Sequence, residues 1–152
     1  MLPCPLVIRL RVPGSLRYRD LAVRVVAAAC KLVGKEDDDP AQRAHQFDAA
    51  VVSAFGEAFN NVAMHSYQAR TGDLDVEIEV EPDRITIRLI DFGVTFDPMK
   101  IPEPDLDSLP ESGMGIYIMR SFMDDVQYQS GSPNVLSMTK YLNERSLRTG
   151  TK

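Results

Sequence analysis

Several features are scarce in this chain of 152 residues, and each scarcity excludes a class of protein. There are only two cysteines, Cys4 and Cys30, without the spacing of metal ligands, which indicates a reduced protein of the cytoplasm. No basic segment followed by an apolar run opens the chain, so we expect no secretory signal. The most apolar stretch, residues 21–33, is interrupted by Arg24 and Lys31 and is too short to span a bilayer. These absences favour a cytoplasmic protein without a membrane segment.

Basic residues are also fewer than acidic ones, with 17 Lys and Arg against 22 Asp and Glu. The formal net charge is −5, which disfavours direct nucleic-acid binding through a broad basic surface. Hydrophobic residues make up 44% and charged residues 26%, as in ordinary globular proteins, and no repeat or low-complexity segment interrupts the chain. A chain of this length can bury a substantial core. We therefore expect one domain over residues 1–143, followed by a C-terminal tail at residues 144–152.

Hydrophobic patterning predicts helices and strands in a definite order. Alternation of apolar and polar residues indicates strands, and apolar residues three or four apart indicate helices. Ser15 is suited to begin the first helix and Gly34 to end it. An α+β fold follows, a two-layer α/β sandwich in which helices cover one face of a mostly antiparallel, mixed sheet. The predicted strands cover residues 5–12, 74–81, 84–90, 126–129 and 136–142, and the predicted helices cover residues 16–33, 40–67 and 115–123.

The second predicted helix carries polar side chains suited to catalysis. Glu57 and Asn61 are four residues apart and therefore share one helix face, with His65 nearby. A carboxylate can accept a proton from a hydroxyl group, and an amide oxygen can bind Mg²⁺. An ordinary solvated helix face would carry the same residues, so the pair alone leaves both interpretations open.

The rest of this helix is apolar on one side and interrupted by a glycine. Gly56 costs about 1 kcal/mol relative to alanine inside a helix, so we expect close packing or a ligand to require it. The apolar side should face the sheet, since its residues are spaced by four, three and four. These residues are Val51, Phe55, Ala58 and Val62.

Two further short segments have the composition of nucleotide-binding loops. Asp91 ends a predicted strand, where it can accept a hydrogen bond from an exocyclic amine, and Gly93 lets the backbone approach a flat base. Gly113 and Gly115 precede a predicted helix, and backbone N–H groups at a helix N-terminus bind phosphate oxygens. Residues 92–112 contain four prolines and fit no regular element, as in functional or mobile loops. A simple turn and a flexible loop are the alternative interpretations of the two motifs.

In this order, the three segments resemble the GHKL ATP-binding superfamily, and within it the bacterial anti-sigma factor serine-protein kinases. The resemblance covers nearly the whole chain. Its most specific part is residues 113–126, because other members of the superfamily do not share the sequence that follows the glycine motif in this segment. The matching sequences are EAFNNVAMHSY, IDFGVTFDPMKI, SGMGIYIMRSFMDDVQYQS and MTKYL.

The resemblance implies the Bergerat fold, ATP and Mg²⁺ as cofactors, and a role for each matching residue. Glu57 would be the general base that deprotonates a substrate serine, and Asn61 would bind both the metal and the nucleotide. Residues 96–112 would form an ATP lid, and Thr139 would support Asp91. The residues implied to bind the nucleotide are Asn61, His65, Asp91, Gly93, Phe96, Gly113, Met114, Gly115 and Thr139.

The chain departs from the family pattern at three places. Thr95 stands where the superfamily has a second glycine after the strand-end aspartate. Residues 132–134, Ser-Pro-Asn, replace a glycine-threonine segment before the last strand, and Glu111 stands where some relatives have an arginine. The last two changes bear on catalytic rate more than on nucleotide binding.

The family resemblance implies an ATP-dependent serine-protein kinase that is also an anti-sigma factor. Its implied partners are a sigma factor, an anti-anti-sigma protein of the STAS type as phosphorylation substrate, and a second copy of itself in a homodimer. The first alternative is an ATP-binding partner-switching module that transfers no phosphate. The second is a detached histidine-kinase catalytic domain. That class needs a phosphate-accepting histidine on a dimerisation helix, whereas His45 and His65 both lie in the predicted helix of the nucleotide domain itself.

Overall fold

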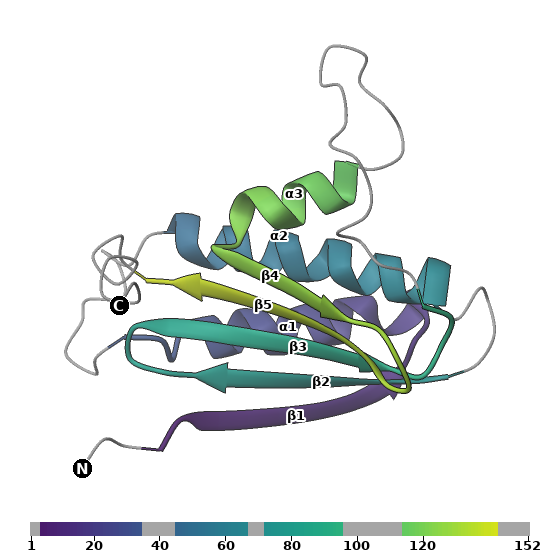
Figure 1. Cartoon of the computed structure of the whole chain (residues 1–152). Coiled ribbons are helices and arrows are strands. Elements are labelled where there is room, and N and C mark those ends of the chain that lie inside the picture. The colour runs from purple at the N-terminus through teal and green to yellow at the C-terminus, as the bar shows by residue number, and fades with distance from the viewer. Residues whose placement is uncertain (1–3, 35–44, 67–71, 96–113, 143–152) are drawn as a thin grey trace.

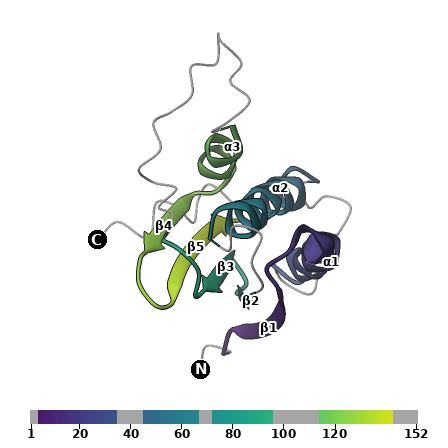
Figure 2. The ribbon, with the colours of Figure 1, turned by 90° about the vertical axis from the view of Figure 1, so that its right-hand side faces the viewer.

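Two layers make up the fold, an antiparallel sheet and a set of helices that covers one of its faces (Figures 1 and 2). The computed structural model describes residues 4–34, 45–66, 72–95 and 114–142. Within these ranges the strands are β1 (Leu6–Pro13), β2 (Asp73–Val80), β3 (Arg84–Asp91), β4 (Asp125–Gln129) and β5 (Asn134–Tyr141). The helices are α1 (Arg19–Cys30), α2 (His45–Asn61) and α3 (Met114–Phe122), with a 3₁₀ turn at Leu16–Tyr18 and a π-helical turn at Val62–Ser66.

The strand order in the sheet is β1-β2-β3-β5-β4, and each of these neighbouring pairs is antiparallel. Two consecutive hairpins form most of it, β2 with β3 and β4 with β5, as the alternating patterns predict. The central strands bury every second side chain toward the helices, because successive residues of a strand face opposite sides of the sheet. The predicted α+β sandwich is confirmed.

Helix α2 packs its apolar side against this sheet. The four residues of the predicted stripe, from Val51 to Val62, are at most 5% exposed, so the prediction is confirmed. The ring of Phe55, one of the four, is tilted against that of Phe59, with the centroids 6.3 Å apart. Burying a side chain of this size contributes about 1.5–3 kcal/mol. The other side of α2 is thereby turned away from the core.

The predicted helix boundaries differ from the observed ones by a few residues. The helix predicted at residues 16–33 is a 3₁₀ turn at its start, followed by α1, which ends at Cys30. The Ser15 hydroxyl accepts a hydrogen bond from the Arg17 amide at the start of this turn. Gly34 has a φ of 105°, the left-handed conformation expected of a residue that stops a helix. The second predicted helix is described only from His45, and its α-helical part gives way to a π-helical turn after Asn61. Such turns often occur at functional sites.

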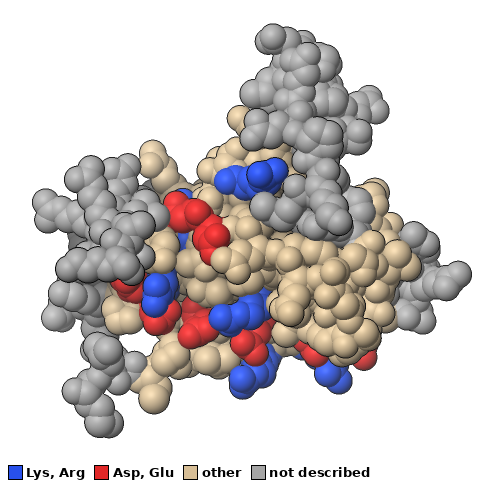
Figure 3. Space-filling model, viewed as in Figure 1, with Lys and Arg blue, Asp and Glu red and all other residues tan. Residues whose placement is uncertain are grey.

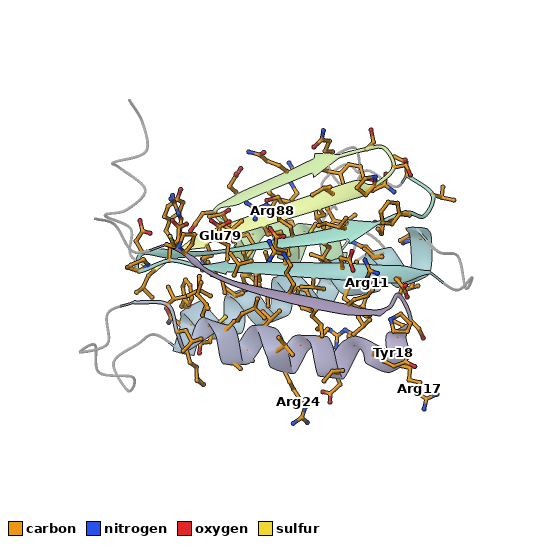
Figure 4. All side chains as sticks on the ribbon, turned by 90° about the horizontal axis from the view of Figure 1, so that it is seen from below. Arg11, Arg17, Tyr18, Arg24, Glu79 and Arg88 are labelled. Carbon is orange, nitrogen blue, oxygen red and sulfur yellow. The ribbon has the colours of Figure 1, made fainter. Side chains whose placement is uncertain are left out.

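The sheet face opposite the helices is covered by ion pairs. Asp75 and Glu77 of β2 form ion pairs with Arg11 and Arg9 of β1. Glu77 also pairs with Arg88 of β3, the strand that neighbours β2 on its other edge. Figure 3 shows the two signs of charge interspersed over the strands, and Figure 4 shows Arg88 beside Glu79. Arg9 and Arg11 are thus each paired with a carboxylate of the neighbouring strand. In the described ranges, no helix combines the length and the apolar character needed to cross a membrane.

We predict a pH-dependent contribution of Asp75 to stability. Its hydrogen bond from Arg11, 2.6 Å from Nε to Oδ1, lowers the pKa of the Asp75 carboxyl below its ordinary value of 3.8. The stabilisation is therefore present above pH 3.8 and is lost as the pH falls through the lowered pKa of the folded state. The Asp75→Asn variant should unfold at lower urea concentration than the wild type at pH 7, and this difference should shrink at pH 2–3. Asp20→Asn, which removes an exposed pair with Arg24, is the control, and a constant difference for Asp75→Asn at all pH values would contradict the assignment.

Candidate functional site

The face of α2 away from the sheet carries the two polar residues expected there. Glu57 and Asn61 are both half-buried and lie one turn apart. The side-chain amide nitrogen of Asn61 is buried and has no hydrogen-bond partner among the described residues. An unsatisfied buried amide is unusual and calls for a ligand or another group nearby. The predicted pairing of a carboxylate with a carboxamide on one helix face is thus present.

The N-terminus of α3 lies directly against Glu57. Helices α2 and α3 pack together (Figure 2), and a methyl group added to Gly115 would collide with Oε2 of Glu57. The first N–H groups of a helix have no partner within the helix, and they favour anions. Glycine at this position therefore lets a carboxylate from α2 approach the backbone that begins α3. The structure brings together two of the three sequence segments here, although they are 58 positions apart.

Asp91 ends β3 on the side of the sheet that faces the helices, and it is only 3% exposed. Its Oδ1 accepts a hydrogen bond of 2.9 Å from the Gly93 amide and one of 3.1 Å from Nδ2 of Asn134. Within the described residues, no hydrogen bond reaches its second oxygen, Oδ2. Asp91 is therefore held through one oxygen, with the other available as an acceptor. Asp91 and Gly93 are thus linked directly, while their predicted roles toward an adenine base stay predictions.

Asn134 is a residue of this site that the sequence did not reveal. It is fully buried, it begins β5, and the strand register places it opposite Asp91. The departure from the family pattern at residues 132–134 was the signal that could have identified it. A buried carboxamide next to a buried carboxylate requires the antiparallel register of β3 and β5, which the sequence does not show.

The prediction that Thr139 supports Asp91 is wrong. The register pairs Thr139 with Thr86, and the two hydroxyl oxygens are 3.1 Å apart. Thr139 lies five residues after Asn134 in β5, and an odd spacing along a strand changes the face of the sheet. Its side chain therefore lies on the face opposite the helices, whereas Asp91 lies on the helix side.

The remaining predicted residues are placed only in part. Met114 is the first residue of α3 and is half-buried, and His65 is exposed in the π-helical turn after Asn61. Phe96, Gly113 and the predicted lid at residues 96–112 lie outside the described residues.

Gly56, next to Glu57, lies in close contact with a side chain of α1. A methyl group at this position would collide with the guanidinium group of Arg19, whose Nε donates a hydrogen bond of 3.4 Å to the Gly56 carbonyl. The predicted alternatives were close packing and a ligand, and the structure favours close packing. Arg19 thereby fixes α1 against the part of α2 that carries Glu57.

The donors at this site suit a nucleotide with a bound divalent cation. Among the described residues, no group of three or more His, Cys, Asp or Glu side chains could hold a metal by itself. Asn61 could supply one ligand through its amide oxygen, as for Mg²⁺, which takes few protein ligands and completes its shell with water and phosphate. Its unpartnered nitrogen is a donor, which suits a phosphate oxygen and not a cation. The described residues therefore fit a nucleotide-bound cation better than a metal site built by the protein alone.

Comparison with known proteins identifies the family. Residues 12–140 match the model of the histidine kinase-like ATPase domain. The chain belongs to this family. The match includes the described parts of the site, from α2 through β5. The resemblance to the GHKL superfamily seen in the sequence is confirmed.

Relatives within this ATPase family include serine-protein kinases. The chain is 38% identical over 108 residues to the serine-protein kinase RsbW of Bacillus licheniformis, covering 64% of this chain and 67% of that protein. It is 26% identical over 149 residues to the serine-protein kinase RsbW of Bacillus cereus (strain Q1), covering 92% and 88%. Among solved structures, the Acinetobacter baumannii histidine kinase AdeS matches 89% of this chain and 68% of its own, with a TM-score of 0.48 and 15% identity.

We predict that Gly56 and Arg19 are energetically coupled. The Gly56→Ala substitution gains about 1 kcal/mol of helix propensity but displaces the Arg19 guanidinium and its hydrogen bond, so its net effect should lie within about 1 kcal/mol of zero. In an Arg19→Ala background, the same substitution should stabilise the protein by about 1 kcal/mol. Urea unfolding of the four proteins of this cycle measures the coupling. Equal, strongly destabilising effects in both backgrounds would show that something other than Arg19 requires the glycine.

Proposed function

We propose that this protein is an ATP-dependent serine-protein kinase and an anti-sigma factor. The observation that carries the proposal is the contact of the Glu57 carboxylate with the first turn of α3 at Gly115. The carboxylate that we propose as the base thus lies beside a helix N-terminus that is suited to bind phosphate, an arrangement that supports phosphoryl transfer over simple nucleotide binding. The family match and the serine-protein kinases among the relatives support the same activity.

In this proposal each part of the site binds one part of ATP. Asp91 accepts a hydrogen bond from the exocyclic amine of adenine through Oδ2, and Gly93 lies beside the base. The backbone at the start of α3, including Met114 and Gly115, binds phosphate oxygens. Asn61 holds Mg²⁺ through its amide oxygen, and His65, one turn further, lies within reach of the phosphates. Phe96 and Gly113 complete the nucleotide site as expected from the family.

The catalytic work of the protein is positioning and proton transfer. Glu57 accepts the proton of the substrate serine hydroxyl as its oxygen attacks the terminal phosphorus of ATP. The bond from that phosphorus to the bridging oxygen of ADP breaks, so the products are phosphoserine and ADP. Mg²⁺, when bound, neutralises charge on the phosphates. The helix N-terminus of α3 holds the phosphates in line with the serine, and α2 keeps the base beside them.

The proposed partners follow from the family. The protein would sequester a sigma factor, and an anti-anti-sigma protein of the STAS type would release it. Phosphorylation of a serine on that second protein would break their complex, because a doubly charged group in a packed interface is repulsive and costly to desolvate. We propose that the protein acts as a homodimer in the cytoplasm, with no direct contact with nucleic acid or membrane.

We predict that Glu57→Gln separates catalysis from binding. The substitution keeps the shape of the side chain and removes the proton acceptor, so phosphoserine formation should fall about 100-fold or more. The affinity for ADP should change by less than about threefold, because in this proposal Glu57 contacts the serine hydroxyl and not the adenine ring. Phosphate incorporation into the cognate partner and calorimetric titration with ADP measure the two effects.

A control with the intact protein decides between the proposal and its alternative. If the wild type binds ADP but forms no phosphoserine on its partner with Mg-ATP, the protein is a partner-switching module without phosphotransfer. If Glu57→Gln retains full activity, Glu57 is not the base.

We also predict that Gly115→Ala lowers activity without lowering stability. The added methyl group must displace the Glu57 carboxylate, while alanine favours a helix over glycine by about 1 kcal/mol. The melting temperature should stay equal or rise, and phosphoserine formation should fall at least tenfold. Ser121→Ala, at an exposed position of the same helix, should leave the activity unchanged. Full activity of Gly115→Ala would mean that the contact with Glu57 is not needed for catalysis.

A further inference from the structure

The buried side chain of Asn134 uses all of its hydrogen-bonding capacity at the end of β3. Nδ2 donates to Oδ1 of Asp91 at 3.1 Å and to the Gly93 carbonyl at 3.0 Å. Oδ1 accepts from the Gly131 amide and from the Thr95 hydroxyl, each at 3.0 Å. A carboxamide offers two donors and one oxygen with two acceptor positions, so its capacity is filled.

The backbone partners fix the orientation of this amide. The Gly93 carbonyl can only accept and the Gly131 amide can only donate, so the Asn134 nitrogen must face Gly93 and its oxygen must face Gly131. The nitrogen is consequently also the atom that faces Asp91. A rotated amide would lose the bonds to Asp91, Gly93 and Gly131 at a position that is fully buried.

The consequence for Asp91 is a carboxylate held in one plane. Both of its hydrogen bonds within the described residues, from Gly93 and from Asn134, converge on Oδ1. Two donors from different elements, the chain after β3 and the start of β5, prevent rotation about the bond that carries the carboxylate. Oδ2 is then presented as an acceptor in a fixed direction. A hydroxyl residue could not make both of the bonds that Nδ2 of Asn134 makes, because one O–H cannot donate to both Asp91 and the Gly93 carbonyl.

We infer that Asn134 is the positioning residue that gives this site its selectivity for adenine nucleotides. The inference rests on the proposed function, in which Oδ2 of Asp91 binds the exocyclic amine of the base. Hypoxanthine has a carbonyl oxygen in place of that amine, so a fixed carboxylate oxygen repels it. A carboxylate that is free to rotate discriminates less between the two bases. Asn134 thus acts on specificity through Asp91 and does not itself touch the nucleotide.

The test compares ADP with inosine diphosphate as ligands of wild type and variants. Asn134→Val and Asn134→Asp remove the amide donor to Asp91, and the ratio of ADP affinity to inosine diphosphate affinity should fall at least tenfold in both. ADP affinity should fall more than inosine diphosphate affinity, whereas general damage to the fold would lower both equally. Calorimetric titration gives the affinities, and circular dichroism melting checks that each variant is folded.

Three further single variants and one double variant make the test specific. Thr139→Val, in the same strand but on the other face, should leave the ratio unchanged. Asp91→Asn should abolish the preference for ADP. Adding Asn134→Asp to Asp91→Asn should change the ratio of the two affinities by less than about twofold further, because the two residues act as a unit. Thr95→Val removes one bond to Asn134 from an exposed position, and it should lower the ratio two- to fivefold even if the Asn134 variants do not fold.

The outcomes separate the inference from the proposed function. If the wild type binds neither diphosphate, the proposed function fails and the inference fails with it. If the wild type prefers ADP, and the folded Asn134 variants keep that preference within twofold, the inference alone is overturned. If the Asn134 variants do not fold, an unchanged ratio in Thr95→Val overturns it.

Discussion

The structure depends on the burial of one side of α2 against the central strands. Phe55 and Phe59 and the smaller apolar residues of that side are excluded from water, which fixes the rotation of the helix about its axis. Glu57, outside that apolar side, then lies against the start of α3. The same hydrophobic contact that stabilises the fold therefore sets the direction of the proposed catalytic base. Arg19 adds to this from α1, through its hydrogen bond to the Gly56 carbonyl.

The candidate site is assembled where regular elements begin or end. Asp91 is the last residue of β3, Asn134 the first of β5, and Gly115 lies in the first turn of α3. Antiparallel pairing places the end of one strand beside the start of its neighbour, so Asp91 and Asn134 meet although 43 positions separate them. At such positions backbone groups are not all used within the element, and they remain available to side chains or ligands. Three of the candidate-site residues thus lie where the regular hydrogen bonding of the fold stops, whereas Glu57 lies within α2.

Much of the fold could be predicted because its patterns are local. Alternation in β2 and β3 and the apolar spacing in α2 depend only on neighbouring residues, and each predicted strand and helix of the described ranges is present. The error at Thr139 has a different origin. A family position was assigned without the register of β5, and a shift of one residue along a strand moves a side chain to the other face of the sheet. Asn134, on the correct face, remained unrecognised for the same reason.

The sequence by itself determined the order of the elements, the apolar side of α2 and the pairing of Glu57 with Asn61, because helix and strand periodicity follow from backbone geometry alone. It also determined the family, through motifs that keep their order along the chain. Only the tertiary structure decided which distant groups meet. The approach of Gly115 to Glu57 and the hydrogen bonds of Asn134 to Asp91 depend on helix packing and strand register, and both are set by the burial of the whole core and not by neighbouring residues.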